Sequence, residues 1–232
     1  MKVWVKILFA LLVLCRSGQA QGFANLNFEQ STIVSSSPSG YGFDSGTANV
    51  PGWTEYNAPF DSNYAGGMTI GYNNQTLDAA GIQVEGTNYW SPAIQGKYSI
   101  LIFGGDSWNS AQDTNGAAIG KTGQIPLGTQ SITYWGYSYN NLQITFGGQS
   151  LSFYAISSTA SYTIYQADVS AYAGQTGELL FYAPWYYIGN HDGITGGGMI
   201  DNIQFSTAAV PEPSTFALTA FGGLLLAFRR RR

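Results

Sequence analysis

Residues 141–155 read Asn-Leu-Gln-Ile-Thr-Phe-Gly-Gly-Gln-Ser-Leu-Ser-Phe-Tyr-Ala, and this stretch decides the fold class. Apolar and polar residues alternate on both sides of a Gly-Gly pair. The apolar residues are expected to share one inward face: Leu142, Ile144 and Phe146 before the pair, then Leu151, Phe153 and Ala155 after it. Gly147-Gly148 suits a two-residue turn. The stretch therefore predicts an antiparallel hairpin with one face on a core and the other in water.

Similar short runs, separated by turn residues, recur on both sides of this hairpin. The further predicted strands lie at Leu26–Glu29, Trp53–Tyr56, Met68–Tyr72, Tyr98–Phe103, Ala117–Ile119, Ser131–Tyr139, Ser161–Asp168, Gly177–Ala183 and Met199–Phe205. Helix is scarce, with a turn or two expected at Ala167–Ala173. No repeat of fixed period occurs, which weighs against a propeller or a solenoid. The pattern predicts one all-β domain over residues 21–207, an antiparallel β-sandwich.

The first 20 residues have the form of a secretory signal peptide. Lys2 and Lys6 precede an apolar run over residues 7–14, and Gly18 and Ala20 supply the small side chains that signal peptidase requires. Cleavage is then expected before residue 21. Cys15 offers an alternative as a lipoprotein cysteine, although the residue before it is a leucine, which is large for that processing signal.

The last 19 residues have the form of a membrane segment with a basic end. Residues 214–228 are apolar or small and are followed by Arg229, Arg230, Arg231 and Arg232. As a helix these 15 residues span about 22 Å, against a hydrocarbon core of about 30 Å. The arginine run places the C-terminus in the cytoplasm and the body outside it. A C-terminal core helix is the alternative, but such a helix would need a polar face.

The charge of the body excludes several kinds of partner. Lys97 and Lys121 are the basic residues between the two terminal segments, whereas 12 of the 13 acids lie there, so the formal charge is 2 − 12 = −10. Nucleic acids and anionic membrane surfaces bind to basic patches, and this body has none.

The C-terminal segment resembles the PEP-CTERM sorting signal, which combines a short motif, an apolar stretch and a basic end. The matching motif residues are Val210, Pro211, Glu212, Pro213 and Ser214. The resemblance implies a sorting tail over residues 208–232 and an exosortase-type enzyme of a Gram-negative bacterium as partner. Such a protein is exported, held in the inner membrane with its body in the periplasm, and then passed to the cell surface or extracellular matrix. The alternative is an accidental Pro-Glu-Pro linker.

The body resembles, more loosely, the jelly-roll sandwiches of galactose-binding-like and carbohydrate-binding modules. Asn27–Glu29 and Pro51–Trp53 are similar to their opening strand and the tryptophan strand after it, and Ile200–Ile203 is similar to their closing strand. The resemblance implies a structural calcium shared by these strands, with Glu29 and Asp201 as ligands. It leaves the middle of the domain unmatched.

Asp201 also stands out in the strand pattern, because period-2 alternation places it on the same face as Ile203 and Phe205. A carboxylate on a core face is costly unless it is paired or bound to a cation. The alternative to calcium is a carboxylate that accepts backbone N–H groups at a strand end.

The sequence gives little indication of a catalytic site. His191 is the one histidine of the chain, lies in a glycine-rich loop and has no nucleophile-elbow motif to act with. A pair of carboxylates could serve a glycosidase. Among 12 acids, however, the sequence does not single out such a pair. We therefore expect a protein that is not an enzyme.

Aromatic residues are the remaining candidates for a binding site. Trp135 and Tyr137 are expected on the strand face opposite Ile132, and Trp185 lies in a Trp-Tyr-Tyr run. Exposed aromatic rings of this kind could stack on neutral sugars, although cross-strand packing is the alternative for each of them. The sequence thus predicts a noncatalytic surface or matrix protein that binds neutral exopolysaccharide. A structural or adhesive domain without sugar specificity, and less so a glycan-cleaving enzyme, are the alternatives.

Overall fold

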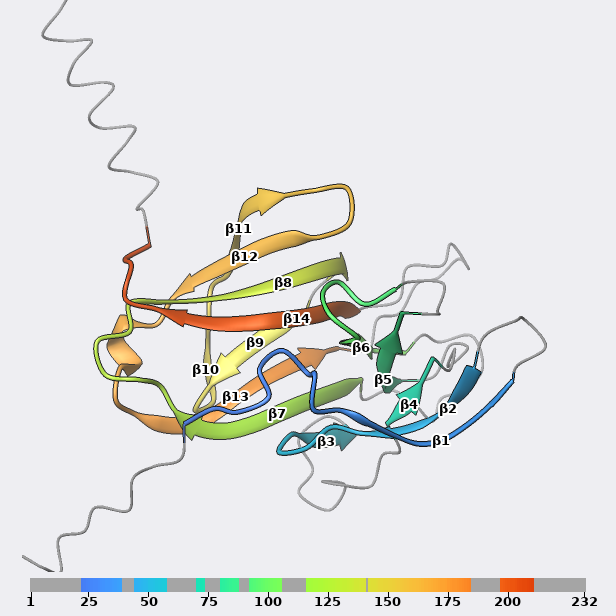
Figure 1. The fold of residues 1–232 in the computed structure, drawn as a ribbon. Coiled ribbons are helices and arrows are strands. Elements are labelled where there is room, and N and C mark those ends of the chain that lie inside the picture. Colours follow the sequence, from blue (N-terminus) through green and yellow to red (C-terminus); the bar gives the residue numbers. More distant parts are fainter. Residues whose placement is uncertain are drawn as a thin grey trace, which may run out of the picture.

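The fold consists of short strands in two sheets (Figure 1). The computed structural model describes residues 22–38, 44–57, 70–73, 80–87, 92–105, 116–140, 142–184 and 197–210. Within these ranges the strands are β1 Thr32–Pro38, β2 Asp44–Asn49, β3 Thr54–Asn57, β4 Gly71–Tyr72, β5 Gly81–Gly86, β6 Tyr98–Phe103, β7 Ala117–Gln124, β8 Ser131–Asn140, β9 Gln143–Phe146, β10 Gln149–Ser150, β11 Tyr154–Ser158, β12 Thr163–Asp168, β13 Thr176–Ala183 and β14 Gly197–Ser206. A single-turn 3₁₀ helix, Ser170–Tyr172, precedes β13.

The larger sheet has the order β1-β2-β4-β5-β6-β14-β8-β12-β11, and the smaller sheet has the order β10-β9-β13-β7-β3. Among the described strands, β4 and β5 are the parallel pair and the other neighbours are antiparallel. The all-β prediction is confirmed. The jelly-roll topology stays a prediction.

One hydrophobic core lies between the two sheets. The larger sheet contributes Ile82, Val84, Ile100, Ile102, Ile132 and Ile200, and the smaller sheet contributes Ile119, Ile144, Leu179 and Phe181. Side chains at every second strand position point the same way, so each strand gives alternate residues to this core. Full burial of one such side chain stabilises the fold by about 1.5–3 kcal/mol.

The hairpin predicted at residues 141–155 is partly right. β9 and β10 pair with Gln149 opposite Phe146, so Gly147-Gly148 forms a two-residue turn. Both glycines have positive φ, 54° and 78°, as a type I′ turn requires. The prediction that Ala155 faces inward is wrong, because β11 is an edge strand of the larger sheet and Ala155 is exposed.

The strand predicted at Leu26–Glu29 is wrong. Asn25 and Phe28 have positive φ, 53° and 57°, which breaks an extended run. The segment instead folds into turns, in which the Phe28 N–H donates to the carbonyl of Asn25 and the Ser31 N–H donates to that of Phe28. Phe28 is completely buried and its ring lies 5.1 Å from that of Trp53.

The face predicted for Asp201 is also wrong, because β14 contains a bulge. Its register against β8 shifts between Asp201 and Gln204, and Asn202 has a φ of 45°. Ile200 and Ile203 both reach the core. A bulge changes the phase of the alternation. Asp201 therefore lies on the outer face of the larger sheet, beside Ser99 of β6.

Both ends of the described body lie at the same end of the fold (Figure 1). Gly22 forms an isolated bridge with Gln124, the last residue of β7. Ser131, the first residue of β8, donates its hydroxyl to the carbonyl of Ala208 at 2.9 Å. The predicted signal peptide and most of the predicted sorting tail lie outside the described residues. Among the residues that are described, no helix has the length and apolar character of a membrane span.

Candidate functional site

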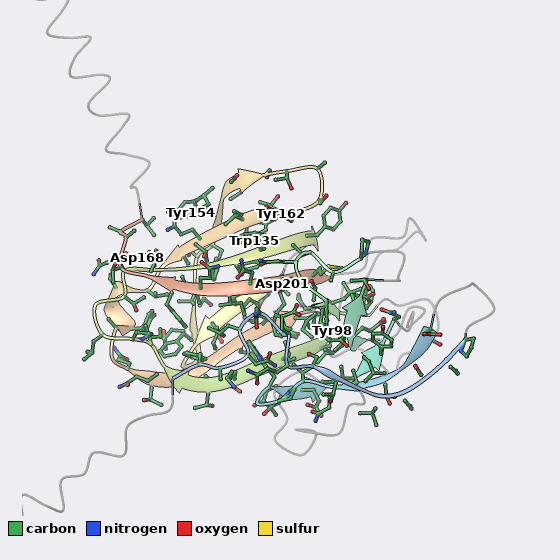
Figure 2. All side chains as sticks on the ribbon, in the orientation of Figure 1. Tyr98, Trp135, Tyr154, Tyr162, Asp168 and Asp201 are labelled. Atoms are coloured by element: carbon green, nitrogen blue, oxygen red, sulfur yellow. The ribbon has the colours of Figure 1, made fainter. Side chains whose placement is uncertain are left out.

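β8 carries aromatic side chains on both of its faces. Ile132 and Tyr134 point into the core, with exposed fractions of 1% and 4%. The alternation then places Trp135 and Tyr137 on the outer face, as the sequence predicts. Tyr162, just before β12, stacks on Trp135 with ring centroids 4.5 Å apart and ring planes 5° apart (Figure 2). We call Trp135, Tyr137 and Tyr162 the outer strip.

The outer strip is held in place by its neighbours. Gly136, between Trp135 and Tyr137, faces the core side of β8, where a Cβ would lie 2.6 Å from the Tyr134 ring. Tyr137 pairs with Met199 of β14 and is 48% exposed. Trp135 is half-buried, and its stack with Tyr162 covers one face of its indole. The strip is thus a fixed, partly solvent-accessible aromatic surface.

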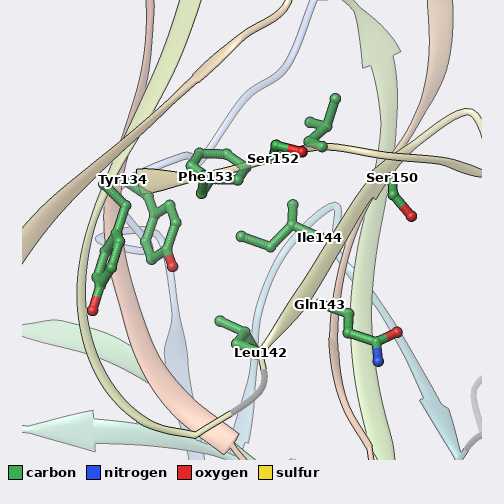
Figure 3. A pocket seen from close by; sticks show the side chains of 9 residues that line it. Tyr134, Leu142, Gln143, Ile144, Ser150, Ser152 and Phe153 are labelled. Carbon is green, nitrogen blue, oxygen red and sulfur yellow. The ribbon is translucent and has the colours of Figure 1, made fainter. Parts of the chain in front are cut away.

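A pocket of about 450 Å³ opens on the opposite side of β8, between the two sheets (Figure 3). β8 and β12 form one wall, β9 forms another, and the segment that crosses from β10 to β11 closes the third side. The lining residues are Tyr134, Leu142, Gln143, Ile144, Ser150, Leu151, Ser152, Phe153 and Tyr165. We call this cavity the inter-sheet pocket.

Glu29 and Asp201, the predicted calcium ligands, come together around one turn. Glu29 Oε1 accepts the backbone N–H groups of Lys97 at 2.8 Å and Tyr98 at 3.3 Å. Asp201 Oδ2 accepts the Gln95 N–H and the Ser99 hydroxyl, both at 2.9 Å. Two carboxylates from distant parts of the chain thus fix the turn that leads into β6.

These contacts fit a hydrogen-bonding role better than a calcium site. Asp201 Oδ1 also accepts the N–H of Asn202 at 2.6 Å, so both of its oxygens face donors rather than a cation. Burial raises the pKa of Asp201 to about 6, despite the donors from Ser99, Asn202 and Gln95 that lower it. Within the described ranges, no group of three or more acidic, His or Cys side chains could hold a metal ion. The calcium site stays a prediction.

A second buried carboxyl, Glu85 on β5, has no such donors. It is completely buried, and neither of its oxygens has a hydrogen-bond partner among the described residues. Burial raises the pKa of Glu85 to about 8. Asn73 lies next to it, accepting the Gly86 N–H through Oδ1 at 2.8 Å while its Nδ2 stays unpaired within the described part of the chain.

The comparison with known protein families concerns the C-terminus. Residues 209–232 match the family model described as the PEP-CTERM protein-sorting motif. The chain ends in a PEP-CTERM motif. No curated protein and no solved structure matches the chain.

PEP-CTERM motifs are recognised by exosortases, so the chain is an exported protein that is sorted through the membrane. The last described residues lead directly into this motif. The Gln130 N–H donates to the carbonyl of Ser206 at 2.8 Å, which ties the end of β14 to the start of β8. The match to the PEP-CTERM motif thus begins three residues after the end of β14.

Several predicted site residues lie outside the described residues. They are Trp185, His191, Pro211, Glu212, Pro213, Ser214, Arg229, Arg230, Arg231 and Arg232. Val210 is the last described residue and is half-buried.

Sequence reasoning missed Glu85, Asn73 and most of the inter-sheet pocket. Gln83 and Glu85 alternate with Ile82 and Val84, a pattern that normally indicates one solvated face. Both faces of β5 are nevertheless buried. The pocket depends on which strands become neighbours, and this information is absent from local alternation.

Proposed function

We propose that this protein is a noncatalytic component of the cell surface or extracellular matrix, which holds neutral exopolysaccharide through its two-sheet body. In this proposal, signal peptidase removes the leader and the tail holds the body at the periplasmic side of the inner membrane. Exosortase then acts at the PEP-CTERM motif and passes the body outward. The PEP-CTERM motif supports the proposed export and sorting, and the outer strip supports the proposed binding of polysaccharide.

The observation that carries the binding proposal is a partly exposed cluster of aromatic rings on a body that has only two basic residues. Trp135 and Tyr162 stack in parallel, and Tyr137 stands beside them with about half of its surface accessible. Aromatic faces offer a platform for the C–H faces of sugar rings. An acidic polysaccharide would be repelled by a body of formal charge −10, whereas a neutral one would not.

The inter-sheet pocket bears on the alternative of a glycan-cleaving enzyme. Glycosidases use two carboxyl groups that flank the bond to be cleaved. The nine residues that line this pocket include no Asp or Glu.

The test is the binding of the full chain to neutral and acidic polysaccharides, compared with the variants Trp135→Ala and Tyr137→Ala. We expect saturable binding to a neutral polysaccharide and a loss of about tenfold in affinity for each variant, equivalent to about 1.4 kcal/mol. Leu127→Ala is the control, because Leu127 is 85% exposed and lies outside the strip.

Circular dichroism on each variant separates lost binding from lost folding. The proposal fails if the folded chain binds no neutral polysaccharide, or if Leu127→Ala weakens binding as much as the strip variants do. Tyr137→Phe, which keeps the ring, should bind like the original chain.

A structural or adhesive role is the second candidate, and one observation favours it. One face of the Trp135 indole is already covered by Tyr162, as expected of a packing residue. If Trp135→Ala lowers the thermal stability without any glycan being bound by the original chain, this second role is the one that stands.

A further inference from the structure

An exposed apolar turn connects β7 to β8 at the end of the body where β14 finishes. The Thr129 N–H donates to the carbonyl of Pro126 at 3.2 Å, and the Thr129 hydroxyl donates to the same oxygen at 2.8 Å. Gly128 has a φ of 78°, as the third position of a type II turn requires. Leu127 occupies the second position and is 85% exposed. We call residues 126–129 the leucine turn.

The leucine turn is anchored on both sides. Thr129 is buried after it, and Ile125 is buried before it. The Ile125 N–H donates to the carbonyl of Gln175 at 3.0 Å, and the Ile125 carbonyl accepts the Gly174 N–H at 2.9 Å. A Cβ on Gly174 would lie 2.6 Å from the Leu127 side chain, so the glycine leaves space for it. The turn thus presents Leu127 to the surroundings in a fixed direction.

A single exposed leucine is not unusual, but the degree of exposure and the position of this one are informative. Among the described residues, Val34 is the next most exposed of the large apolar side chains, at 67%. The leucine turn leads directly into Gln130, whose N–H donates to the carbonyl of Ser206, the last residue of β14. Figure 1 shows the connection between β7 and β8 at the same end of the fold as the end of β14.

The surface around the leucine turn is nearly uncharged. Hydrogen bonds join three described segments here, residues 124–131, 168–176 and 206–210. Asp168 is the one charged residue in these segments, and its carboxylate accepts the Ser170 N–H at 2.7 Å (Figure 2). The exposed apolar or small residues beside Leu127 are Pro126, Gly128, Ala171, Ala208 and Ala209. Such a surface has little hydration to lose when it contacts neutral lipid.

In the proposed function, the tail keeps this end of the body close to the membrane. β14 ends at Ser206 and the apolar stretch begins at residue 214, so residues 207–213 separate the two. These residues can span at most about 25 Å. A tether of this length gives an effective concentration in the millimolar range, at which even a weak contact is populated.

We propose that the leucine turn inserts into the interface of a bilayer of neutral lipids while the tail holds the body at the membrane. This inference rests on the proposed function, because it needs the tail as a tether. An apolar side chain at a bilayer interface gains from leaving water. The formal charge of −10 on the body would oppose the same contact with anionic lipids, so neutral lipid is the partner.

This contact would orient the body on the membrane. β7, β8 and β14 run away from the end that carries the leucine turn (Figure 1). With the turn in the interface, these strands would stand upright on the bilayer. The outer strip, on the outer face of β8, would then face sideways and stay accessible to polysaccharide.

The test uses the full chain, with Cys15→Ser to remove its one native cysteine, reconstituted in phosphatidylcholine vesicles. A fluorophore on Ala171→Cys reports proximity to lipids that carry a spin label on the headgroup and quench fluorescence. We expect the probe to be quenched, and Leu127→Ser to lower this quenching about twofold or more. Leu127→Trp should keep the quenching, because tryptophan favours the membrane interface.

Val34→Ser is the matched control, since Val34 is also an exposed aliphatic residue but lies on β1, away from this end of the fold (Figure 1). It should leave the quenching unchanged. The inference is wrong if the probe is not quenched in the chain with Leu127 intact. It is also wrong if Leu127→Ser and Val34→Ser give the same quenching.

Flotation of the vesicles and polysaccharide binding separate this inference from the proposed function. If the chain floats with the vesicles but Leu127→Ser changes nothing, the leucine contact fails and the proposed function survives. If quenching depends on Leu127 but no neutral polysaccharide binds, the contact stands and the proposed binding fails. If the chain does not float with the vesicles, the proposed tether and the leucine contact are both overturned.

Discussion

Glu85 lies on β5 with its carboxyl group buried and without a hydrogen-bond donor among the described residues. Its ionised form is therefore unfavourable in the folded state, and burial raises its pKa to about 8 from a usual value of 4.5. Between these two values the folded chain holds a proton that the unfolded chain releases. The contribution of Glu85 to stability is thus greatest below pH 4.5, falls as the pH rises, and stops falling above about pH 8.

Glu85→Gln should remove this dependence, because the amide has nearly the same shape and never ionises. We expect the variant to match the original chain near pH 4 and to exceed it by several kcal/mol in the free energy of unfolding near pH 9. Urea denaturation at a series of pH values is the measurement. Parallel stability curves for the two proteins between pH 6 and 8 would show that Glu85 does not titrate in this way.

Asp201 shows how differently a buried carboxylate behaves when donors surround it. Its pKa is raised as well, but only to about 6, because three hydrogen bonds to Ser99, Asn202 and Gln95 partly offset burial. With Glu29 it holds the turn at Gln95–Tyr98. Its contribution to the pH dependence lies at lower pH than that of Glu85, so the two effects are separable.

Among the elements, the β9–β10 hairpin is the clearest link between sequence and structure. Gly147 and Gly148 both adopt positive φ, and a Cβ on either would meet nothing within 4 Å. Any cost of replacing them is therefore a backbone cost rather than a clash. Type I′ turns favour Asn at the first position and Gly at the second.

Gly148→Val should destabilise the chain by about 1–3 kcal/mol, because a β-branched residue is poorly compatible with positive φ. Gly147→Asn should leave the stability almost unchanged. Thermal unfolding of both variants tests this difference. Equal melting temperatures for the two variants would contradict the turn assignment.

How well the sequence predicted each element depended on its surroundings. β6 coincides with its predicted range, Tyr98–Phe103, and the strongly alternating strands β8, β9, β13 and β14 were also located within a few residues. These strands each give one face to the core, so alternation reports them directly.

The missed elements have other physical origins. β1 and β2 contain Ser-Ser-Ser-Pro and Asp-Ser-Gly-Thr, which resemble loop sequences, and both lie at one edge of the larger sheet where little is buried. β5 is buried on both faces despite its polar residues. At the candidate site, the outward direction of Trp135 and Tyr137 followed from alternation, whereas the pocket required strand order.

For the whole molecule, the relevant feature is how close the end of the described fold lies to the sorting motif in the sequence. The PEP-CTERM motif follows directly after residues that are tied to the start of β8. The last described strand, β14, ends at Ser206, three residues before the match to the motif begins at residue 209.

Replacing Pro211 and Pro213 by alanine should block sorting without affecting the body. We expect the variant to accumulate in the inner-membrane fraction of a cell that contains exosortase, while the original chain appears in the surface or medium fraction. Immunoblots of the cell fractions measure this. If the double variant reaches the surface as efficiently as the original chain, the motif is not the sorting determinant.

The same arrangement has a mechanical consequence. β14 leads into the tail and lies between β6 and β8, and β8 carries the outer strip. Tension between the tail and a polysaccharide on that strip would cross a single ladder, β14–β8. A pull along the strand axis loads the hydrogen bonds of that ladder together, because they run perpendicular to the strands. The resistance of this ladder to such a pull is set by its unfolding rate rather than by its equilibrium stability.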